Sequence, residues 1–227
     1  MNEHTMQVIA TLRTELPTKF GVPRQSGLVK ELRGTVVFEP EYRDPEALRG
    51  LEGFSHLWLI WQFSGAVRET WSPTVRPPRL GGNARLGVFA TRSPFRPNPL
   101  GLSCVKLEAI EKHPADGTVL IVSGVDLMDG TPIYDVKPYL PYADCIPEAR
   151  GGFAASAPEP LTVEFPPALL AELSPRQQAA VLGVLAQDPR PRYQTDPERE
   201  YGLRFAAWDI RFRVAGSVLT VCSLRRV

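Results

Sequence analysis

Residues 55–63 read SHLWLIWQF, and this run says more about the fold class than any other part of the chain. Both of its alternating faces are largely apolar, with Leu57, Leu59 and Trp61 on one and His56, Trp58 and Ile60 on the other. A short run rich in aromatic and aliphatic residues is typical of a β-strand, and two apolar faces indicate burial on both sides. The run therefore predicts a central strand of a β-rich domain.

Other short apolar runs before residue 140 have the same character and are bounded by Gly, Pro or Asp. They are QVIATL (7–12), GTVVFE (34–39), ARLGVFAT (84–91), LSCVKLEAI (102–110), TVLIVSGVD (118–126) and IYDVKPY (133–139). No long amphipathic helix separates them, apart from a short candidate at 44–51, which disfavours a doubly wound α/β sheet. We therefore expect a closed or nearly closed β-barrel.

The composition changes after Pro147. The segment EARGGFAASAPEP (148–160) is typical of a linker, and a helix start follows, with Ser174 as N-cap, Pro175 at N1 and Gln177 at N3. The helix should end at Asp188 and Pro189, before two β-runs at 205–214 and 217–224 that Ala215-Gly216 joins as a hairpin. We expect a barrel domain over 1–147, a linker over 148–160, and a small α+β domain over 161–227 that needs docking for stability.

The composition excludes several classes of protein. A chain of 227 residues with 43% hydrophobic residues and a net charge of +1 can fill a core, so global disorder is disfavoured. The N-terminus has no export signal and no long apolar run, so we expect a soluble cytoplasmic protein that does not enter a membrane. Three scattered cysteines and three scattered histidines suit reduced thiols, and we expect no metal site.

Residues 76–101, RPPRLGGNARLGVFATRSPFRPNPLG, form an arginine-rich stretch without any acidic residue. Guanidinium groups and the backbone N–H groups of such a Gly- and Pro-rich loop can bind phosphates or carboxylates. The alternative is an ordinary solvated loop whose arginines pair with the acidic segment 39–52. Both interpretations fit the composition.

Further special segments stand where strands should end, namely FGVPRQSGLV (20–29), DLMDGTPIYDVKPYLPY (126–142) and LAQDPRPRY (185–193). Glycines allow close backbone approach to a ligand, and prolines keep a loop stiff, although tight turns have the same composition. In the second segment Asp135, Lys137 and Tyr139 alternate and should project from one face. They suit either the handling of a substrate proton or an ion pair at a barrel rim.

These segments, with VPRQSGLV (22–29) and GLEGFSHLWLI (50–60), closely resemble the TrmO-type tRNA methyltransferases over nearly the whole chain. No dinucleotide-binding, P-loop, nucleophile-elbow or zinc-protease motif competes with this resemblance. The resemblance implies a homodimeric methyltransferase that uses S-adenosylmethionine (SAM) and a β-barrel rather than a Rossmann sheet. It implies methylation of N6 of N6-threonylcarbamoyladenosine at position 37 of tRNA.

The same resemblance places the SAM site at Pro23, Arg24, Gln25, Ser64, Gly65, Arg92, Leu102, Asp129, Gly130, Thr131 and Pro132. Relatives commonly carry His-Gln where this chain has Ser64-Gly65, which removes side-chain contacts. We expect phosphate contacts with tRNA, including its anticodon arm, from Arg76, Arg79, Arg85, Arg96, Asn98, Arg190 and Arg192. The last two also fit a helix end with solvated charges, or a link between the domains.

Within the Asp135, Lys137 and Tyr139 set, Asp135 or Tyr139 would accept the N6 proton and Lys137 would pair with the substrate carboxylate. Two other functional classes stay open on the sequence alone. One is a non-catalytic RNA-binding protein that uses the same basic stretch. The other is an enzyme that consumes SAM on a different substrate.

Overall fold

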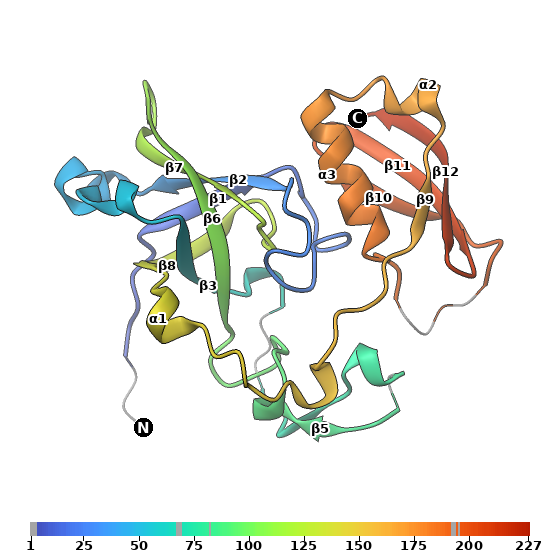
Figure 1. The fold of residues 1–227 in the computed structure, drawn as a ribbon, viewed down its shortest axis with the longest axis horizontal. Helices are drawn as coiled ribbons and strands as arrows, with labels where there is room; N and C mark the ends of the chain where they lie inside the picture. Colours follow the sequence, from blue (N-terminus) through green and yellow to red (C-terminus); the bar gives the residue numbers. More distant parts are fainter. Residues whose placement is uncertain (1–3, 67–69, 82, 192–193, 195) are drawn as a thin grey trace.

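The computed structural model describes residues 4–66, 70–81, 83–191, 194 and 196–227. Its N-terminal part is a closed barrel of antiparallel strands in the order β1-β2-β7-β6-β3-β8, which confirms the predicted β-barrel (Figure 1). The strands are β1 (Ala10–Thr14), β2 (Arg33–Phe38), β3 (His56–Gln62), β6 (Leu100–His113), β7 (Gly117–Ser123) and β8 (Thr131–Pro138). Neighbouring barrel strands all run antiparallel.

The strand β3 is buried on one face and half-buried on the other. Leu57 and Leu59 are fully buried inside the barrel and Trp61 nearly so. On the outer face Trp58 is covered in part by the ring of Tyr139 and donates to Asp144 at 3.0 Å. The prediction of a central strand was wrong in this respect, because every strand of a closed barrel has two neighbours and an outer face.

The run 84–91 does not form a barrel strand. Both edges of β3 are already paired, with β6 and β8, so the barrel leaves no edge for it. Instead β4 (Thr74–Val75) and β5 (Leu86–Gly87) form a small separate hairpin, followed by the 3-10 turn η6 (Val88–Ala90). The helix expected at 44–51 is also absent as such, since η2 (Pro45–Leu48) and η3 (Leu51–Gly53) are 3-10 turns separated at Gly50, whose φ is +87°.

Shorter elements complete this half of the chain. They are the 3-10 turns η1 (Pro40–Tyr42), η4 (Ser64–Ala66) and η5 (Pro78–Leu80), then α1 (Pro141–Asp144) and η7 (Gly152–Ala154). The last two lie on the connection to the C-terminal unit, which in Figure 1 runs from the barrel to the sheet beside α3.

The C-terminal unit is a four-stranded sheet in the order β10-β11-β12-β9 with a helix against it. Its elements are β9 (Thr162–Glu164), α2 (Pro167–Leu170), α3 (Pro175–Ala186), β10 (Tyr201–Phe205), β11 (Trp208–Ala215) and β12 (Val218–Arg226). The capping box predicted for α3 is confirmed, since the Ser174 hydroxyl accepts from the Gln177 N–H at 3.4 Å and the Gln177 side chain accepts from the Ser174 N–H at 3.2 Å. The predicted hairpin exists, but its turn is at Gly216-Ser217 rather than Ala215-Gly216.

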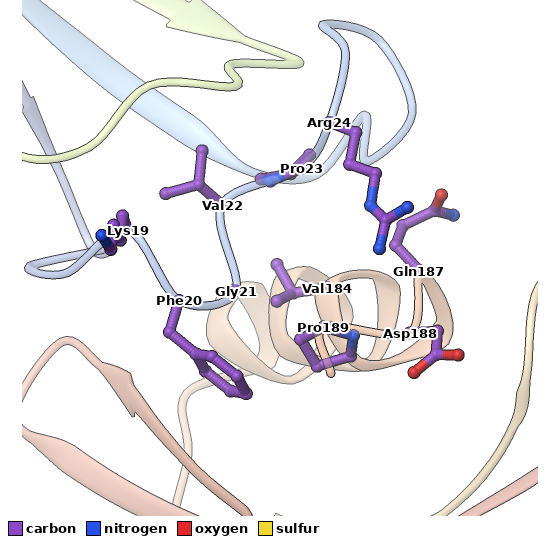
Figure 2. Close-up of a pocket in the computed structure, with 10 residues that line it drawn as sticks. All are labelled: Lys19, Phe20, Gly21, Val22, Pro23, Arg24, Val184, Gln187, Asp188 and Pro189. Atoms are coloured by element: carbon purple, nitrogen blue, oxygen red, sulfur yellow. The ribbon is translucent and has the colours of Figure 1, made fainter. Parts of the chain in front are cut away.

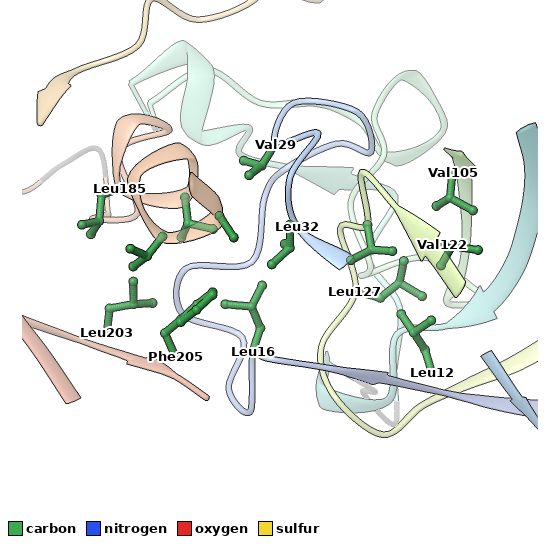
Figure 3. Close-up of a cluster of buried hydrophobic side chains, with 14 of the residues drawn as sticks. Leu12, Leu16, Val29, Leu32, Val105, Val122, Leu127, Leu185, Leu203 and Phe205 are labelled. Carbon is green, nitrogen blue, oxygen red and sulfur yellow. The ribbon is translucent and has the colours of Figure 1, made fainter. Parts of the chain in front are cut away.

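The segment between β1 and β2 (15–32) joins the two units into one hydrophobic core. Leu16 and Val29 from this segment lie in the same buried cluster as Leu185, Leu203 and Phe205 of the C-terminal unit (Figure 3). Glu15 adds polar contacts, because its carbonyl accepts from the Ala206 N–H at 2.7 Å and its carboxylate from Arg176 and Gln177. The small domain is therefore docked on the barrel, as its size predicts.

Candidate functional site

The special segments of the barrel domain meet at one end of the barrel. Because neighbouring strands alternate in direction, the connections 15–32, 63–99 and 124–130 leave the barrel at the same end. Residues 39–55 and 114–116 leave it at the opposite end, which Figure 1 shows for the turns η1 to η3. The segments that carry the predicted SAM residues thus converge, although they are far apart in the sequence.

The acidic segment 39–52 lies at the other end and so does not neutralise the arginine-rich stretch. Arg49 pairs with Glu46 inside the acidic segment itself. Among the described residues, none of the arginines between 76 and 99 forms a salt bridge. The alternative of a solvated loop paired with that acidic segment therefore has no support, and the positive charge of the stretch stays available.

The predicted cofactor loop at 23–27 is tied to two other segments. The Arg92 guanidinium donates to the Gln25 side-chain oxygen, so two predicted SAM residues from different connections are in contact. The Ser26 hydroxyl accepts from the Cys104 N–H at 3.1 Å, and the Gly27 N–H donates to the Gly124 carbonyl at 2.8 Å. The loop is therefore held against the start of β6 and the end of β7.

A chain of hydrogen bonds that sequence reasoning missed runs beside this loop. The Trp61 indole N–H donates to the Ser103 hydroxyl at 2.9 Å, and this hydroxyl donates to the Asp126 carboxylate at 2.5 Å. Ser103 is fully buried inside the barrel. Burial raises the pKa of Asp126 to about 6, although hydrogen bonds from Ser103 and from the backbone at Ser26, and the charge of Arg92, act in the opposite direction.

The raised pKa of Asp126 predicts a dependence of stability on pH. An unfolded aspartate has a pKa of about 3.9, so folding takes up a proton between pH ~4 and ~6, and the free energy of unfolding falls as pH rises through that window. The difference corresponds to at most about 3 kcal/mol. In Asp126→Asn this component should disappear, so urea unfolding at a series of pH values should favour the variant increasingly up to neutral pH. Equal pH profiles for both proteins would contradict the assignment.

The predicted SAM residues 129–132 form the DGTP turn, which leads from the β7–β8 connection into β8 and contacts β1. The Asp129 carboxylate accepts from the Thr14 N–H at 2.9 Å, and the Gly130 N–H donates to the Leu12 carbonyl at 2.9 Å. Thr131 is buried, and its hydroxyl donates to the Met128 carbonyl at 2.6 Å. Pro132 of β8 lies opposite Thr11 of β1. Gly130, with φ of +74°, adopts the left-handed conformation that this turn requires.

The remaining predicted SAM residues lie in two places. Ser64 and Gly65 are exposed in η4, and a Cβ built on Gly65 would be 3.6 Å from the Met128 side chain, which places this turn beside the DGTP turn. Leu102 is 53% exposed and opposite Ile60 on the outer face of the barrel, whereas Ser103 points inward. The structure therefore brings Ser64 and Gly65 to the other loops but directs Leu102 away from the barrel interior.

The arginine-rich stretch folds mostly through contacts with neutral groups. Arg79 donates to the Ser156 backbone carbonyl. Arg85 donates two hydrogen bonds to the Thr74 hydroxyl, from its Nη2 at 2.7 Å and from its Nε at 2.9 Å. Arg96 donates to the Thr91 carbonyl at 3.2 Å. Arg76 and Asn98 are exposed. Neutral partners leave the charges uncompensated, as an anion-binding surface needs.

Asp135 and Lys137 lie on the outer face of β8, and their side chains form an ion pair at 2.8 Å with Lys137 largely exposed. Tyr139 follows the strand, and its ring packs against His56 and Trp58. β8 runs away from the cofactor loops, so Tyr139 lies about 26 Å along the chain from Thr131. Burial raises the pKa of Tyr139, so its hydroxyl is a poor proton acceptor near neutral pH. The structure does not bring these groups to the cofactor loops of the same chain.

From the C-terminal motif 185–193, Gln187, Asp188 and Pro189 meet the cofactor loop at a pocket of about 310 Å³ (Figure 2). Arg24 lies there beside the side chain of Gln187, at the end of α3. Arg190 is only 14% exposed and forms an ion pair with Asp188 at 2.9 Å. A phosphate would have to compete with Asp188 for it, which favours a structural role at the domain junction. Arg192 lies outside the described residues.

Two further structural facts concern classes of site. Within the described ranges, none of the helices has the length and the apolar character that crossing a bilayer requires. In the same part of the chain, His, Cys, Asp and Glu side chains do not gather in groups of three or more that suit a metal ion. Cys104, Cys145 and Cys222 are free thiols.

Comparison with known proteins gives consistent matches over both units. A tRNA (adenine(37)-N6)-methyltransferase of Escherichia coli is 43% identical over 235 residues, which cover 99% of this chain and 99% of the relative. A Pseudomonas aeruginosa protein described as an S-adenosylmethionine-dependent methyltransferase is 44% identical over 215 residues, 91% of this chain and 90% of the relative. The crystal structure of TrmO from Pseudomonas aeruginosa superposes with a TM-score of 0.81 at 35% identity, covering 99% of each chain.

Family models divide the chain into the same two units as the structure, the barrel and the C-terminal sheet. The model of the tRNA-methyltransferase O N-terminal domain matches residues 11–145, which contain all of the barrel except Ala10, the first residue of β1. The model of the TrmO C-terminal domain matches residues 158–227, which contain the second sheet and α3. With both matches and full-length relatives, the chain belongs to the TrmO family.

Proposed function

We infer that this protein is a SAM-dependent methyltransferase that methylates N6 of adenine 37 in tRNA. The observation that carries this function is the E. coli tRNA (adenine(37)-N6)-methyltransferase, which matches at 43% identity across 99% of both chains. The convergence of the loops 23–27, 63–99 and 124–130 supplies a site for it at one end of the barrel. Nothing in the structure favours the alternatives of a non-catalytic RNA-binding protein or a SAM-consuming enzyme with another substrate.

The residues at this end suit the chemical groups of SAM. Arg24 and Arg92 offer guanidinium groups for the methionyl carboxylate, and Arg92 already bonds to the neutral amide of Gln25. The Asp126 carboxylate, ionised above a pKa of about 6, supplies a negative charge that suits a cationic ligand. When bound, SAM supplies a methyl group on a positively charged sulfur. The loops hold and orient the reactants, and such alignment lowers the barrier to displacement by several kcal/mol.

We further propose that the adenine carries the threonylcarbamoyl group on N6. This group makes the N6–H more acidic than in plain adenosine, so a strong base is less necessary. Its carboxylate needs a cationic partner, and the anticodon arm around it needs phosphate contacts. Arg76, Arg79, Arg85 and Arg96 meet the second need, since none of them forms a salt bridge among the described residues.

Lys137 is our candidate partner of the substrate carboxylate, with Asp135 as the candidate proton acceptor. If so, Lys137→Ala should lower the rate of methylation by about tenfold or more while SAM affinity is unchanged. Lys106→Ala is a matched control, because Lys106 forms a similar ion pair with Glu108, at 3.0 Å, on β6, which β3 separates from β8. Equal rates for both variants would make the Lys137–Asp135 pair a surface ion pair, worth less than ~1 kcal/mol of stability.

The protein should act as a homodimer in the cytoplasm. Exposed apolar side chains support self-association: Leu102 on the outer face of β6, and Tyr142 and Ile146 near α1. Because Asp135 and Lys137 lie on the outer face of β8, a partner subunit offers a route by which they can approach a cofactor end. Light scattering on the purified protein measures the mass directly.

Two experiments test the proposed function. Nucleosides from the tRNA of a strain lacking this protein should contain N6-threonylcarbamoyladenosine without the additional N6-methyl group. The purified protein should transfer a methyl group from SAM to that tRNA, and comparison with tRNA carrying plain adenosine 37 tests the finer assignment. Persistence of the methylated nucleoside in the deletion strain would assign the activity to another protein.

A further inference from the structure

The hairpin of β4 and β5 carries an exposed aromatic pair on the arginine-rich side of the barrel. Trp71 is 51% exposed and Phe89 is 72% exposed, and their rings are stacked with centroids 6.2 Å apart and planes at 29°. Large aromatic side chains gain free energy by burial, so two of them exposed side by side indicate a surface that binds something.

The local structure fixes this pair in place. Thr74 and Val75 of β4 pair with Gly87 and Leu86 of β5, so the residues just before β4 and just after β5 are neighbours. The Val88 N–H donates to the Pro73 carbonyl at 2.9 Å, and the Val88 side chain is buried. Val88 therefore points inward, and Phe89, the next residue of η6, points outward. Backbone pairing thus holds side by side the two segments that carry the aromatic pair.

The surroundings of the pair are positively charged. From Thr70 to Leu107 the sequence contains five arginines and no acidic residue. Arg85, which precedes β5, donates to the Thr74 hydroxyl and keeps its full charge, and Arg76 beside β4 is exposed. Aromatic rings among basic side chains are the combination that binds single-stranded nucleic acid, through base stacking and phosphate contacts.

The proposed reaction needs such a surface. The N6 atom of a stacked base is not accessible to a buried methyl donor, so the target adenine must leave the stack, and its neighbour in the loop then loses a stacking partner. Phe89 is three residues from Arg92, a distance of at most about 11 Å between Cα atoms. Arg92 contacts Gln25 of the cofactor loop. The aromatic pair is thus close to the place where the target base would be held.

We propose that Trp71 and Phe89 form a stacking platform for an unpaired anticodon-loop base next to the adenine that is methylated. This inference rests on the proposed function, because it requires tRNA as the substrate. A second copy of this chain is a less suitable partner, since a two-fold axis through the patch would bring the same acid-free arginine stretch of both copies together.

The test measures binding of a fluorescent anticodon stem-loop RNA that carries N6-threonylcarbamoyladenosine at position 37. In the double variant Trp71→Ala and Phe89→Ala the Kd for the RNA should rise by roughly tenfold to a hundredfold, because the base loses its stacking contact with the aromatic rings. SAM affinity and the salt dependence of RNA binding should be unchanged, since no cation is removed. The single variant Phe89→Tyr keeps an aromatic ring beside Trp71, so its Kd for the RNA should equal that of the unmodified protein.

Phe54→Ala is the control, because Phe54 is also exposed but lies in the connection at the opposite end of the barrel. An unchanged Kd for the double variant, in a protein that methylates this RNA, would overturn the platform and leave the function intact. Loss of the dimer in the double variant would assign the patch to a second copy instead. Absence of methyl transfer by the unmodified protein would overturn the proposed function, and the platform with it.

Discussion

Arg24→Ala is expected to weaken SAM binding by roughly 2 kcal/mol or more, which corresponds to a factor of about 30 in Kd. The cost is large because the loop 23–27 is preformed by contacts of Gln25, Ser26 and Gly27, so the Arg24 guanidinium is in place for a charge-assisted pair with the carboxylate before SAM binds. The substitution would remove the guanidinium that pairs with the SAM carboxylate and would leave the loop itself unchanged. Isothermal titration with SAM measures the change.

A conservative variant and a remote one complete this test. Arg24→Lys keeps the charge but loses the two-bond fork, so its Kd should fall between those of Arg24→Ala and the unmodified protein. Arg49→Ala removes an arginine at the opposite end of the barrel and should have no effect. If Arg24→Ala binds SAM normally, Arg24 instead serves the junction with α3, where it lies beside Gln187 in the interdomain pocket.

The barrel was predictable because its strands are set by local patterns. The run 55–63 and five of the other runs correspond to β1, β2, β3, β6, β7 and β8, since alternation of apolar residues is a property of each strand alone. The run 84–91 has the same composition but supplies only β5, one strand of a short hairpin, and the turn η6. Its exclusion follows from the pairing of β3 with β6 and β8, a long-range fact that no local pattern contains.

The C-terminal sheet shows the same limit. The run 205–214 reads as one strand, but Ala206, with φ of +50°, turns the chain sharply and separates β10 from β11. The short β9 pairs in parallel with β12, and a three-residue strand of this kind has too little pattern to be recognised. The capped helix α3, by contrast, has start and stop signals in its own sequence.

For the candidate site, the resemblance identified the loops, whereas the structure identified the polar chain behind them. Ser103 and Asp126 are 23 residues apart and meet only because β6 and β7 pair in the barrel. The available signal was a carboxylate that ends an apolar run and a serine on the inward face of another. The alternation of Asp135 and Lys137 correctly predicted a common face but not how far β8 carries them from the cofactor loops.

Gly101→Ala is expected to destabilise the protein by about 3 kcal/mol, at the upper end of the range for overpacking. A Cβ at this position would lie 2.2, 2.4 and 2.6 Å from the Cε2, Cζ2 and Cδ2 atoms of Trp61, so the indole itself would have to move. The ring has little freedom, because it is buried, packs on Phe63 and donates to Ser103. The backbone is equally constrained, since β3 and β6 are neighbours in a closed barrel.

SAM affinity should fall together with stability in Gly101→Ala, because displacement of Trp61 removes the hydrogen bond that orients Ser103 toward Asp126, beside the cofactor loop. Gly87→Ala is the matched control. Nothing lies within 4 Å of a Cβ there and the φ of −56° suits any residue, so its free energy of unfolding should change by less than about 0.5 kcal/mol. Urea unfolding measures both variants.

A second change, Trp61→Leu, should recover part of the stability of Gly101→Ala while leaving SAM affinity low, because it removes the clash but does not restore the indole donor. Equal stability of the Gly101 and Gly87 variants would mean that the barrel opens enough to admit the methyl group. An unchanged SAM affinity in Gly101→Ala would mean that the Trp61 chain does not set the geometry of the cofactor loop.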